Sequence, residues 1–304
     1  MVLFTWSEQD DMTGESMSIK GDTEKQAALR DRMIKGNPET EGEAYIARIQ
    51  AVLKPGMRLL DIGCGTAHIV QRLAERHDRV MFVGLDASPG MLRTARANVE
   101  RFPNVALVAA DGVKLPFRHS AFDIAITRLA EYSPEEAYRV LKQRGYFFEY
   151  GLGPEADKEI AEFFPDRIEV ESFSLPDSVE GWKDEVCKEA RSAGFVVDSV
   201  AEHRENDYYR DEEELADLIE MVPLVRDFDR EKDRPIIDKL AAKYRKQRGI
   251  RITWHYYIMQ ARCVQKGSRT LLPGSYLPGW QNSCPVRSAE VRSGDNHGEA
   301  ICEA

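Results

Sequence analysis

The stretch RLLDIGCGTAHIV, residues 58–70, decides how the rest of the chain is interpreted. A short apolar run ends at Asp61, two glycines separated by one residue follow, and a helical pattern then begins. Glycine-rich turns between a strand and a helix bind phosphates and nucleosides at the edge of a sheet. The spacing therefore predicts a ligand site in this turn and leaves open, at this point, which ligand it takes.

Apolar runs on both sides of this turn predict an α/β fold. Short, continuously apolar runs alternate with segments whose apolar residues recur at helical spacing. The runs are residues 57–63, 79–86, 105–111, 122–130 and 145–153. Continuous apolar strands separated by helices indicate a parallel sheet with helices on both faces, which is a doubly wound arrangement.

The overall composition argues against several classes of protein. The chain has 304 residues and a formal net charge of −10, which disfavours a surface built mainly for nucleic acid. No run approaches the roughly 18 apolar residues that a membrane-spanning helix needs, and the acidic start MVLFTWSEQDD predicts no secretory signal. The five cysteines are scattered and lack C-x-x-C spacing, so no disulfide framework and no metal site are expected. We expect a reduced, cytoplasmic protein.

Two known glycine-rich motifs do not fit the turn. A Walker loop requires a lysine after its last glycine, and none follows Gly65 at that place. A dinucleotide fingerprint requires a third glycine at the position where this chain has His68. Asp61, at the end of the first predicted strand, would repel a pyrophosphate and attract an ammonium group.

The next two predicted strands also end in acidic residues. Asp86 closes the second strand, where a carboxylate suits the two hydroxyls of a ribose. Asp111 closes the third strand, where a carboxylate could accept a hydrogen bond from an adenine amino group. A ligand with an ammonium, a ribose and an adenine, but no pyrophosphate, matches S-adenosylmethionine.

Four stretches resemble, in order, the motifs of class I S-adenosylmethionine-dependent methyltransferases. They are LLDIGCGTA (59–67), VGLDASPGML (83–92), ALVAADGVKLPFRHSAFDIAITRLA (106–130) and AYRVLKQRGYFFE (137–149). The likeness covers residues 42–153, and it extends to Cys263 if 195–204 and 250–263 are the family's sixth strand and its antiparallel seventh. It implies a doubly wound, mostly parallel seven-stranded sheet with an antiparallel last strand and a helical insert between strands 6 and 7.

The chain divides accordingly into three parts. Residues 1–41 form an N-terminal helical cap, and residues 42–263 form the methyltransferase domain with its helical insert at 207–249. Residues 264–304 show no period and are rich in Gly, Ser and Pro, so we expect a disordered tail. We hypothesise that residues 24–40 and the insert form a lid over the methyl acceptor.

The resemblance implies roles around the cofactor's amino-acid end and its ribose. Gly63 and Gly65 let the backbone approach the methionyl part, and Asp61 orients its amino group. Asp86 holds the ribose hydroxyls.

The resemblance also implies contacts with the sugar and the base. Ala87 and Met91 lie near the sugar and the adenine. Asp111 and the backbone of Gly112 read the adenine.

The fourth strand is implied to end beside the reacting methyl group. Arg128 and Leu129 would face the methionyl and methyl region. A general base is needed only if the acceptor must lose a proton. The candidates for that base are Glu131, His68 and His255.

The resemblance predicts a methyltransferase that acts on a small molecule. No Asn/Asp-Pro-Pro-Tyr signature follows the fourth strand, so amino methylation of a DNA base is not expected. The basic stretch 239–251 leaves RNA methylation open as an alternative. A non-catalytic S-adenosylmethionine-binding protein is a further alternative, because the motifs alone do not separate it from an enzyme.

Overall fold

The computed structural model describes residues 24–36, 42–168, 181–222 and 224–264. All of the predicted tail except residue 264 therefore lies outside the described residues. Within the described ranges, no helix has both the length and the apolar character needed to cross a membrane.

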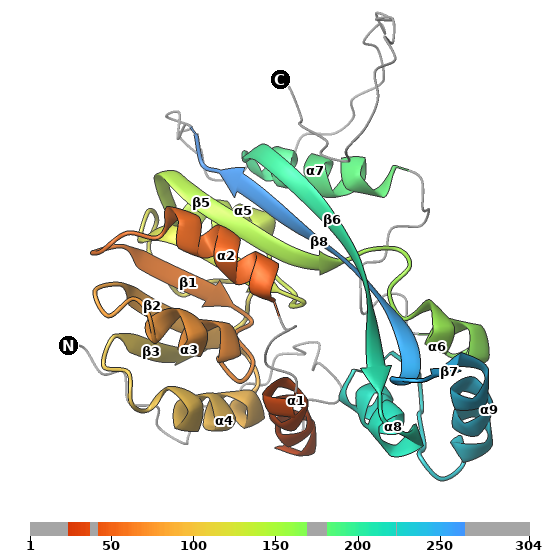
Figure 1. The fold of residues 1–304 in the computed structure, drawn as a ribbon. Helices are drawn as coiled ribbons and strands as arrows, with labels where there is room; N and C mark the ends of the chain where they lie inside the picture. The colour runs from red at the N-terminus through yellow and green to blue at the C-terminus, as the bar shows by residue number, and fades with distance from the viewer. Residues whose placement is uncertain (1–23, 37–41, 169–180, 223, 265–304) are drawn as a thin grey trace, which may run out of the picture.

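One eight-stranded sheet forms the centre of the molecule (Figure 1). Its order is β3-β2-β1-β4-β5-β8-β6, with β7 paired to β8. The strands are β1 (Arg58–Ile62), β2 (Met81–Asp86), β3 (Val105–Ala109), β4 (Phe122–Arg128), β5 (Leu141–Leu152), β6 (Val196–Tyr209), β7 (Arg245–Lys246) and β8 (Gly249–Arg262). β1 to β5 run parallel, and β8 runs antiparallel to β5 and β6. The predicted mostly parallel sheet with an antiparallel last strand is confirmed, and the short β7 adds to the seven strands predicted.

Helices cover both faces of this sheet (Figure 1). One face carries α2 (Glu43–Val52), α3 (His68–Ala74) and α4 (Pro89–Val99), and the other carries α5 (Pro134–Val140) and α7 (Trp182–Ala193). The strands between them are buried on both sides, which explains why the sequence shows continuous apolar runs instead of alternation. Ser88 and Ser133 cap α4 and α5 with their side-chain oxygens, so these helices begin where the sequence offers a cap.

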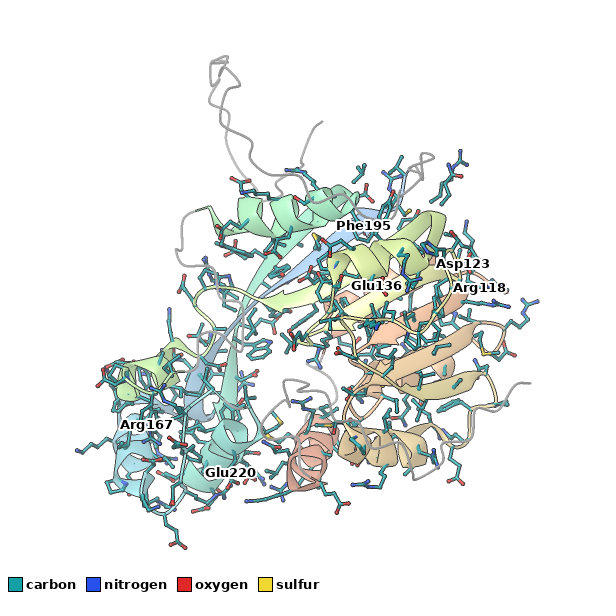
Figure 2. The ribbon with its side chains drawn as sticks, turned by 180° about the vertical axis from the view of Figure 1, so that it is seen from behind. Arg118, Asp123, Glu136, Arg167, Phe195 and Glu220 are labelled. Carbon is teal, nitrogen blue, oxygen red and sulfur yellow. The ribbon has the colours of Figure 1, made fainter. Side chains whose placement is uncertain are left out.

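A separate helical lobe lies at the ends of the two longest strands, β6 and β8 (Figure 1). We define this helical lobe as α6 (Lys158–Phe163), α8 (Glu212–Met221), α9 (Arg234–Tyr244), β7 and the ends of β6 and β8 that they contact. Its core is separate from the two sheet cores and contains Ile160, Leu215, Ile237 and Leu240. Figure 2 shows Arg167 and Glu220 in this lobe, away from Asp123 and Glu136 of the sheet region.

The lobe is larger than the predicted insert. β6 continues to Tyr209, inside the range 207–249, because its register with β8 runs without interruption from Ser199 to that residue. The six-residue helix α6 follows β5, and the sequence did not predict it. Ile160 of α6 is fully buried in the lobe core, so tertiary packing makes this short helix part of the lobe.

Helix α1 (Glu24–Gly36) lies between the sheet region and the helical lobe (Figure 1). On one side Arg93 of α4 pairs with Glu24, and Asn98 of α4 donates to Asp31 over 2.9 Å. On the other side Lys25 pairs with Glu220 of α8 over 2.9 Å. The predicted N-terminal helix is therefore present, and it bridges two parts of the molecule.

Candidate functional site

The turn after β1 is fastened to the end of β2. The N–H groups of Gly63 and Cys64 both donate to the carbonyl oxygen of Leu85, each over 2.8 Å. The N–H of Gly65 donates to Asp86 Oδ2 over 2.7 Å, and Asp86 Oδ1 accepts from the N–H of Ser88 over 2.9 Å. Asp86 therefore fixes two neighbouring turns, which the sequence did not reveal.

The loops after β1, β3 and β4 meet closely at this edge of the sheet. Gly63 has a φ of +72°, and a Cβ atom placed on it would lie 2.1 Å from the Cβ of Ala130. A Cβ on Gly112 would lie 2.5 Å from the carbonyl oxygen of Glu131. The structure thus brings together the glycine turn, the end of β3 and the segment after β4, as the sequence predicted.

A buried carboxyl group dominates the electrostatics of this edge. Asp61 is only 3% exposed. Its pKa is raised to about 7, first by burial and then by the charge of Asp86, against the opposing charge of Arg128. A cation that approached Asp61 would favour its ionised form, so the site is suited to an ammonium group.

A small cavity of about 50 Å³ lies beside the glycine turn. Asp61, Arg128 and His68, at the start of α3, line it. Arg30 and Ile34 of α1 line it as well. The sequence placed both residues in the hypothesised lid over the acceptor, residues 24–40, but did not single them out, because a contact between α1 and a turn over 25 residues later leaves no local signal.

The remaining predicted cofactor residues lie around the same edge with different exposure. Met91, in the first turn of α4, is 1% exposed, whereas Ala87 and Asp111 are exposed. Asp111 Oδ1 accepts from the N–H of Val113 over 2.9 Å. Leu129 has a φ of +52° and is 40% exposed, so a strained backbone presents an apolar side chain at this edge.

The three candidate bases are not equivalent. Glu131 is exposed at the edge, and His68 lines the small cavity. His255 is fully buried on β8, where its Nδ1 accepts from the N–H of Glu155 over 3.0 Å and its Nε2 lies 3.1 Å from Glu202 Oε1. Burial, with the charge of Arg204 as the next cause, lowers the pKa of His255. Both of its ring nitrogens are engaged, and it is not among the residues that line the cavity beside the glycine turn.

Two further polar features were not predicted. Glu149 on β5 accepts hydrogen bonds from Tyr132 and Tyr257, each over 2.7 Å, and burial raises its pKa. Cys64, between the two glycines, is buried, and burial raises the pKa of its thiol well above the usual range, so it stays protonated. In the described ranges no group of three or more His, Cys, Asp or Glu residues is arranged to hold a metal ion.

Comparison with known proteins agrees with this geometry. A family model described as a methyltransferase domain matches residues 59–145. Malonyl-[acyl-carrier protein] O-methyltransferase of Geobacter sulfurreducens is 28% identical over 51% of this chain and 61% of its own length. Demethylmenaquinone methyltransferase of Thermus thermophilus is 38% identical over 31% of this chain and 47% of its own length.

Solved structures support the same fold. A structure from Bacillus halodurans C-125 superposes with a TM-score of 0.54 at 21% identity, covering 73% of this chain and 98% of that one. The YcgJ protein from Bacillus subtilis gives a TM-score of 0.51 at 20% identity with the same coverage. Residues 59–145 are a class I methyltransferase domain. The chain spans 61% and 47% of the length of the two curated relatives named above.

S-adenosylmethionine is the methyl donor of class I methyltransferases, and the residues of this methyltransferase domain fit it. At Gly63 the space that a Cβ would take is filled by Ala130, whereas at Gly65 the nearest atom would lie 3.7 Å from a Cβ, so Gly65 leaves the backbone of the turn open. Burial, followed by the charge of Asp86, raises the pKa of Asp61, and an ammonium group beside it would favour its ionised form.

Proposed function

We propose that this protein transfers a methyl group from S-adenosylmethionine to a small-molecule acceptor. The observation that carries the proposal is the buried Asp61 beside Asp86, held at the edge of a class I sheet by the glycine turn. Two carboxylates at this place would repel a pyrophosphate, and they match an ammonium group and a ribose.

In this proposal each strand end contacts a different part of the cofactor. Asp61 would bind the ammonium group, and Asp86 would bind the ribose while it holds the glycine turn. Asp111 and the Gly112 backbone would contact the adenine. Ala87 and Met91 would lie against the sugar and base, as the resemblance implies; Met91 is the buried member of this pair.

The transfer itself requires positioning more than acid–base chemistry. When bound, the cofactor supplies a methyl group that a sulfonium already activates. Arg128 and Leu129 would line the methyl region, and Glu131 and His68 remain candidates for a base if the acceptor carries a proton. Alignment of acceptor, methyl and sulfur in a dry site can contribute on the order of 7–11 kcal/mol to rate enhancement.

A small-molecule acceptor is favoured over RNA. The relatives are named for malonyl-[acyl-carrier protein] and demethylmenaquinone, which are not nucleic acids. In the basic stretch 239–251, Lys243, Arg245 and Arg251 pair with glutamates of the helical lobe. These pairs reduce the positive charge that an RNA backbone would need. A cytoplasmic location, and a lid formed by residues 24–40 with 207–249, are parts of the same proposal.

Calorimetric titration with S-adenosylmethionine, S-adenosylhomocysteine and NAD tests the cofactor. We expect micromolar binding of the two sulfur nucleosides, no binding of NAD, and loss of binding in Asp86→Ala. The matched control is Asp123→Ala, which removes a carboxylate near the start of β4, remote from the site (Figure 2). Binding of NAD, or no binding of either sulfur nucleoside, would contradict the proposal.

A second assay separates an enzyme from a non-catalytic cofactor-binding protein. Labelled methyl transfer is measured with S-adenosylmethionine and two acceptor classes, malonyl thioesters and demethylated quinones, which the names of the relatives indicate. Transfer to either class supports the proposal. Cofactor binding without transfer across a wide small-molecule screen would favour the non-catalytic alternative.

A further inference from the structure

A carboxyl group interrupts the apolar run of β5 near the carboxyl end of the strand. Glu149 lies within the run 145–153 and is partly buried, where a carboxyl group is costly unless it is hydrogen-bonded. Its Oε1 accepts from the hydroxyl group of Tyr257, and its Oε2 accepts from that of Tyr132, each over 2.7 Å. Both carboxylate oxygens are therefore hydrogen-bonded, and each one is bound by a different tyrosine.

Tyr257 reaches this carboxylate because β5 has no side chain at residue 151. Gly151 is the partner of Tyr257 in the register of β5 with β8. A Cβ atom on Gly151 would lie 2.5 Å from the ring and from the hydroxyl oxygen of Tyr257. The ring therefore lies across the backbone of β5. Its hydrogen bond to Glu149 joins two neighbouring strands that the sheet already holds together.

Tyr132 comes instead from the loop that follows β4. We call residues 129–132 the post-β4 segment. Its first residue, Leu129, has a φ of +52° and donates its N–H to the carbonyl oxygen of Tyr150 over 3.0 Å. Its last residue, Tyr132, donates its hydroxyl group to Glu149. Both ends of the post-β4 segment are therefore bound to β5, at two adjacent residues.

The middle of the post-β4 segment contacts two glycines of the predicted cofactor site. The Cβ of Ala130 lies 2.1 Å from the point where a Cβ on Gly63 would stand. The carbonyl oxygen of Glu131 lies 2.5 Å from the corresponding point at Gly112. A displacement of the post-β4 segment would therefore change the glycine turn and the end of β3 together.

We propose that Tyr132, through its hydrogen bond to Glu149, is a positioning residue that holds the post-β4 segment against the glycine turn and the end of β3. The proposal rests on the proposed function, because the site that Tyr132 positions is the proposed cofactor site. Burial, followed by the charge of Glu149, raises the pKa of both phenols well above the usual range, so both stay protonated and donate. The two donors differ in what they attach to the carboxylate, a loop for Tyr132 and a strand for Tyr257.

The two tyrosines provide a matched pair of variants, because each change to Phe removes one hydroxyl group from the same carboxylate. Both variants should lower the urea-unfolding midpoint by a similar amount. We expect Tyr132→Phe to weaken S-adenosylhomocysteine binding by roughly five- to tenfold, as for loss of about one hydrogen bond to a charged group. Tyr257→Phe is expected to stay within about twofold of the unaltered protein. Calorimetric titration measures both affinities.

Hydrogen exchange at the amide of Leu129 gives a second measurement that needs no ligand. This N–H donates to Tyr150, so its exchange rate, measured by NMR, reports opening of the post-β4 segment. We expect exchange at Leu129 to be roughly tenfold faster in Tyr132→Phe than in Tyr257→Phe. A purely structural role of the two hydroxyl groups would change both variants alike.

The proposal is overturned if the two variants lose S-adenosylhomocysteine affinity equally. It is also overturned if exchange at Leu129 is no faster in Tyr132→Phe than in Tyr257→Phe. If the unaltered protein does not bind S-adenosylhomocysteine, the proposed function itself fails. The exchange comparison then still decides whether Tyr132 holds the post-β4 segment, so the two failures are distinguishable.

Discussion

The end of β1 and the helical lobe each contain buried carboxyl groups, but their surroundings differ. At the end of β1 the pKa of Asp61 is raised to about 7, because burial and Asp86 outweigh Arg128. In the lobe Asp233 accepts two hydrogen bonds from Arg167, of 2.7 and 3.0 Å, and these bonds lower its pKa. In the lobe the charge of Asp233 is neutralised by an arginine of the same chain. The edge at the end of β1 instead keeps an excess of negative charge, which a cationic ligand can neutralise.

A raised pKa alone does not mark a site. Asp157, at the junction of β5 and α6, also has its pKa raised to about 7, by burial and by Asp207 and Glu159. The curated family model ends before it, at residue 145, and the glycines that precede it, Gly151 and Gly153, do not have a positive φ. A buried acid beside a turn whose glycines have a positive φ, as at Asp61 with Gly63 and Gly65, is what distinguishes the cofactor edge.

The largest effect is expected from a methyl group added at the first glycine of the turn. Gly63→Ala places a Cβ 2.1 Å from Ala130, at a φ of +72°. We expect a loss of about 3 kcal/mol or more in the free energy of unfolding and loss of S-adenosylhomocysteine binding. Gly65→Ala has 3.7 Å to its nearest neighbour, so about 1–2 kcal/mol is expected from its left-handed backbone. Equal urea-unfolding midpoints for the two variants would contradict this reading of the turn.

The next effect concerns pH and compares the two raised carboxyl groups directly. Because the pKa of Asp61 is higher folded than unfolded, the folded state binds more protons between about pH 4 and pH 7. Stability is therefore lost as pH rises through this window, by up to about 4 kcal/mol for one such group. Asp61→Asn should remove the part of this pH-dependent loss of stability that comes from Asp61. The ligand-free variant is therefore expected to be more stable than the unaltered protein at pH 8.

Asp157→Asn is the matched control for this comparison. It should reduce the pH dependence in the same direction, because its pKa is also raised to about 7. Urea unfolding at pH 5 and pH 8 gives the stability of each variant, and calorimetry gives its affinity for S-adenosylhomocysteine. We expect Asp61→Asn to weaken binding of S-adenosylhomocysteine and Asp157→Asn to leave it unchanged. Equal losses of affinity in both variants would contradict the assignment of Asp61, and not Asp157, to the cofactor site.

The features near the end of β1 that could be predicted from the sequence are those that depend on local patterns. The strands β1 to β5 and the N-cap at Ser88 depend on local patterns, namely apolar runs and a capping residue. The meeting of Gly63 with the segment after β4 follows from parallel strands whose ends share one edge. Local sequence was therefore sufficient for the sheet and for the placement of the predicted residues around one edge.

Features that depend on distant contacts could not be predicted in this way. α6 is six residues long, and packing of its buried Ile160 in the lobe core makes it part of the lobe. Arg30 reaches the glycine turn only because α1 is held between α4 and α8. The sequence named His255 as a candidate base, and it could not show that both ring nitrogens contact Glu155 and Glu202, which are distant in the sequence.

A change inside the lobe should affect stability without affecting the cofactor. Asp233→Ala removes both hydrogen bonds from Arg167 and leaves a half-buried guanidinium without that partner. We expect a loss of about 2 kcal/mol in the free energy of unfolding. Affinity for S-adenosylhomocysteine is expected to stay unchanged, and a tenfold loss would show that the lobe and the cofactor edge are coupled.

The smallest expected effect is on binding of RNA. We expect neither the end of β1 nor the helical lobe to bind it. Three cations of the stretch 239–251 are engaged with Glu162, Glu212 and Glu159 of the lobe, and the chain carries a net charge of −10. Fluorescence anisotropy with a labelled RNA hairpin at low salt should give an affinity weaker than about 10⁻⁴ M, below the usual non-specific range. Micromolar binding that falls steeply with salt would instead show that the paired cations open toward a phosphate backbone, and the RNA alternative would regain support.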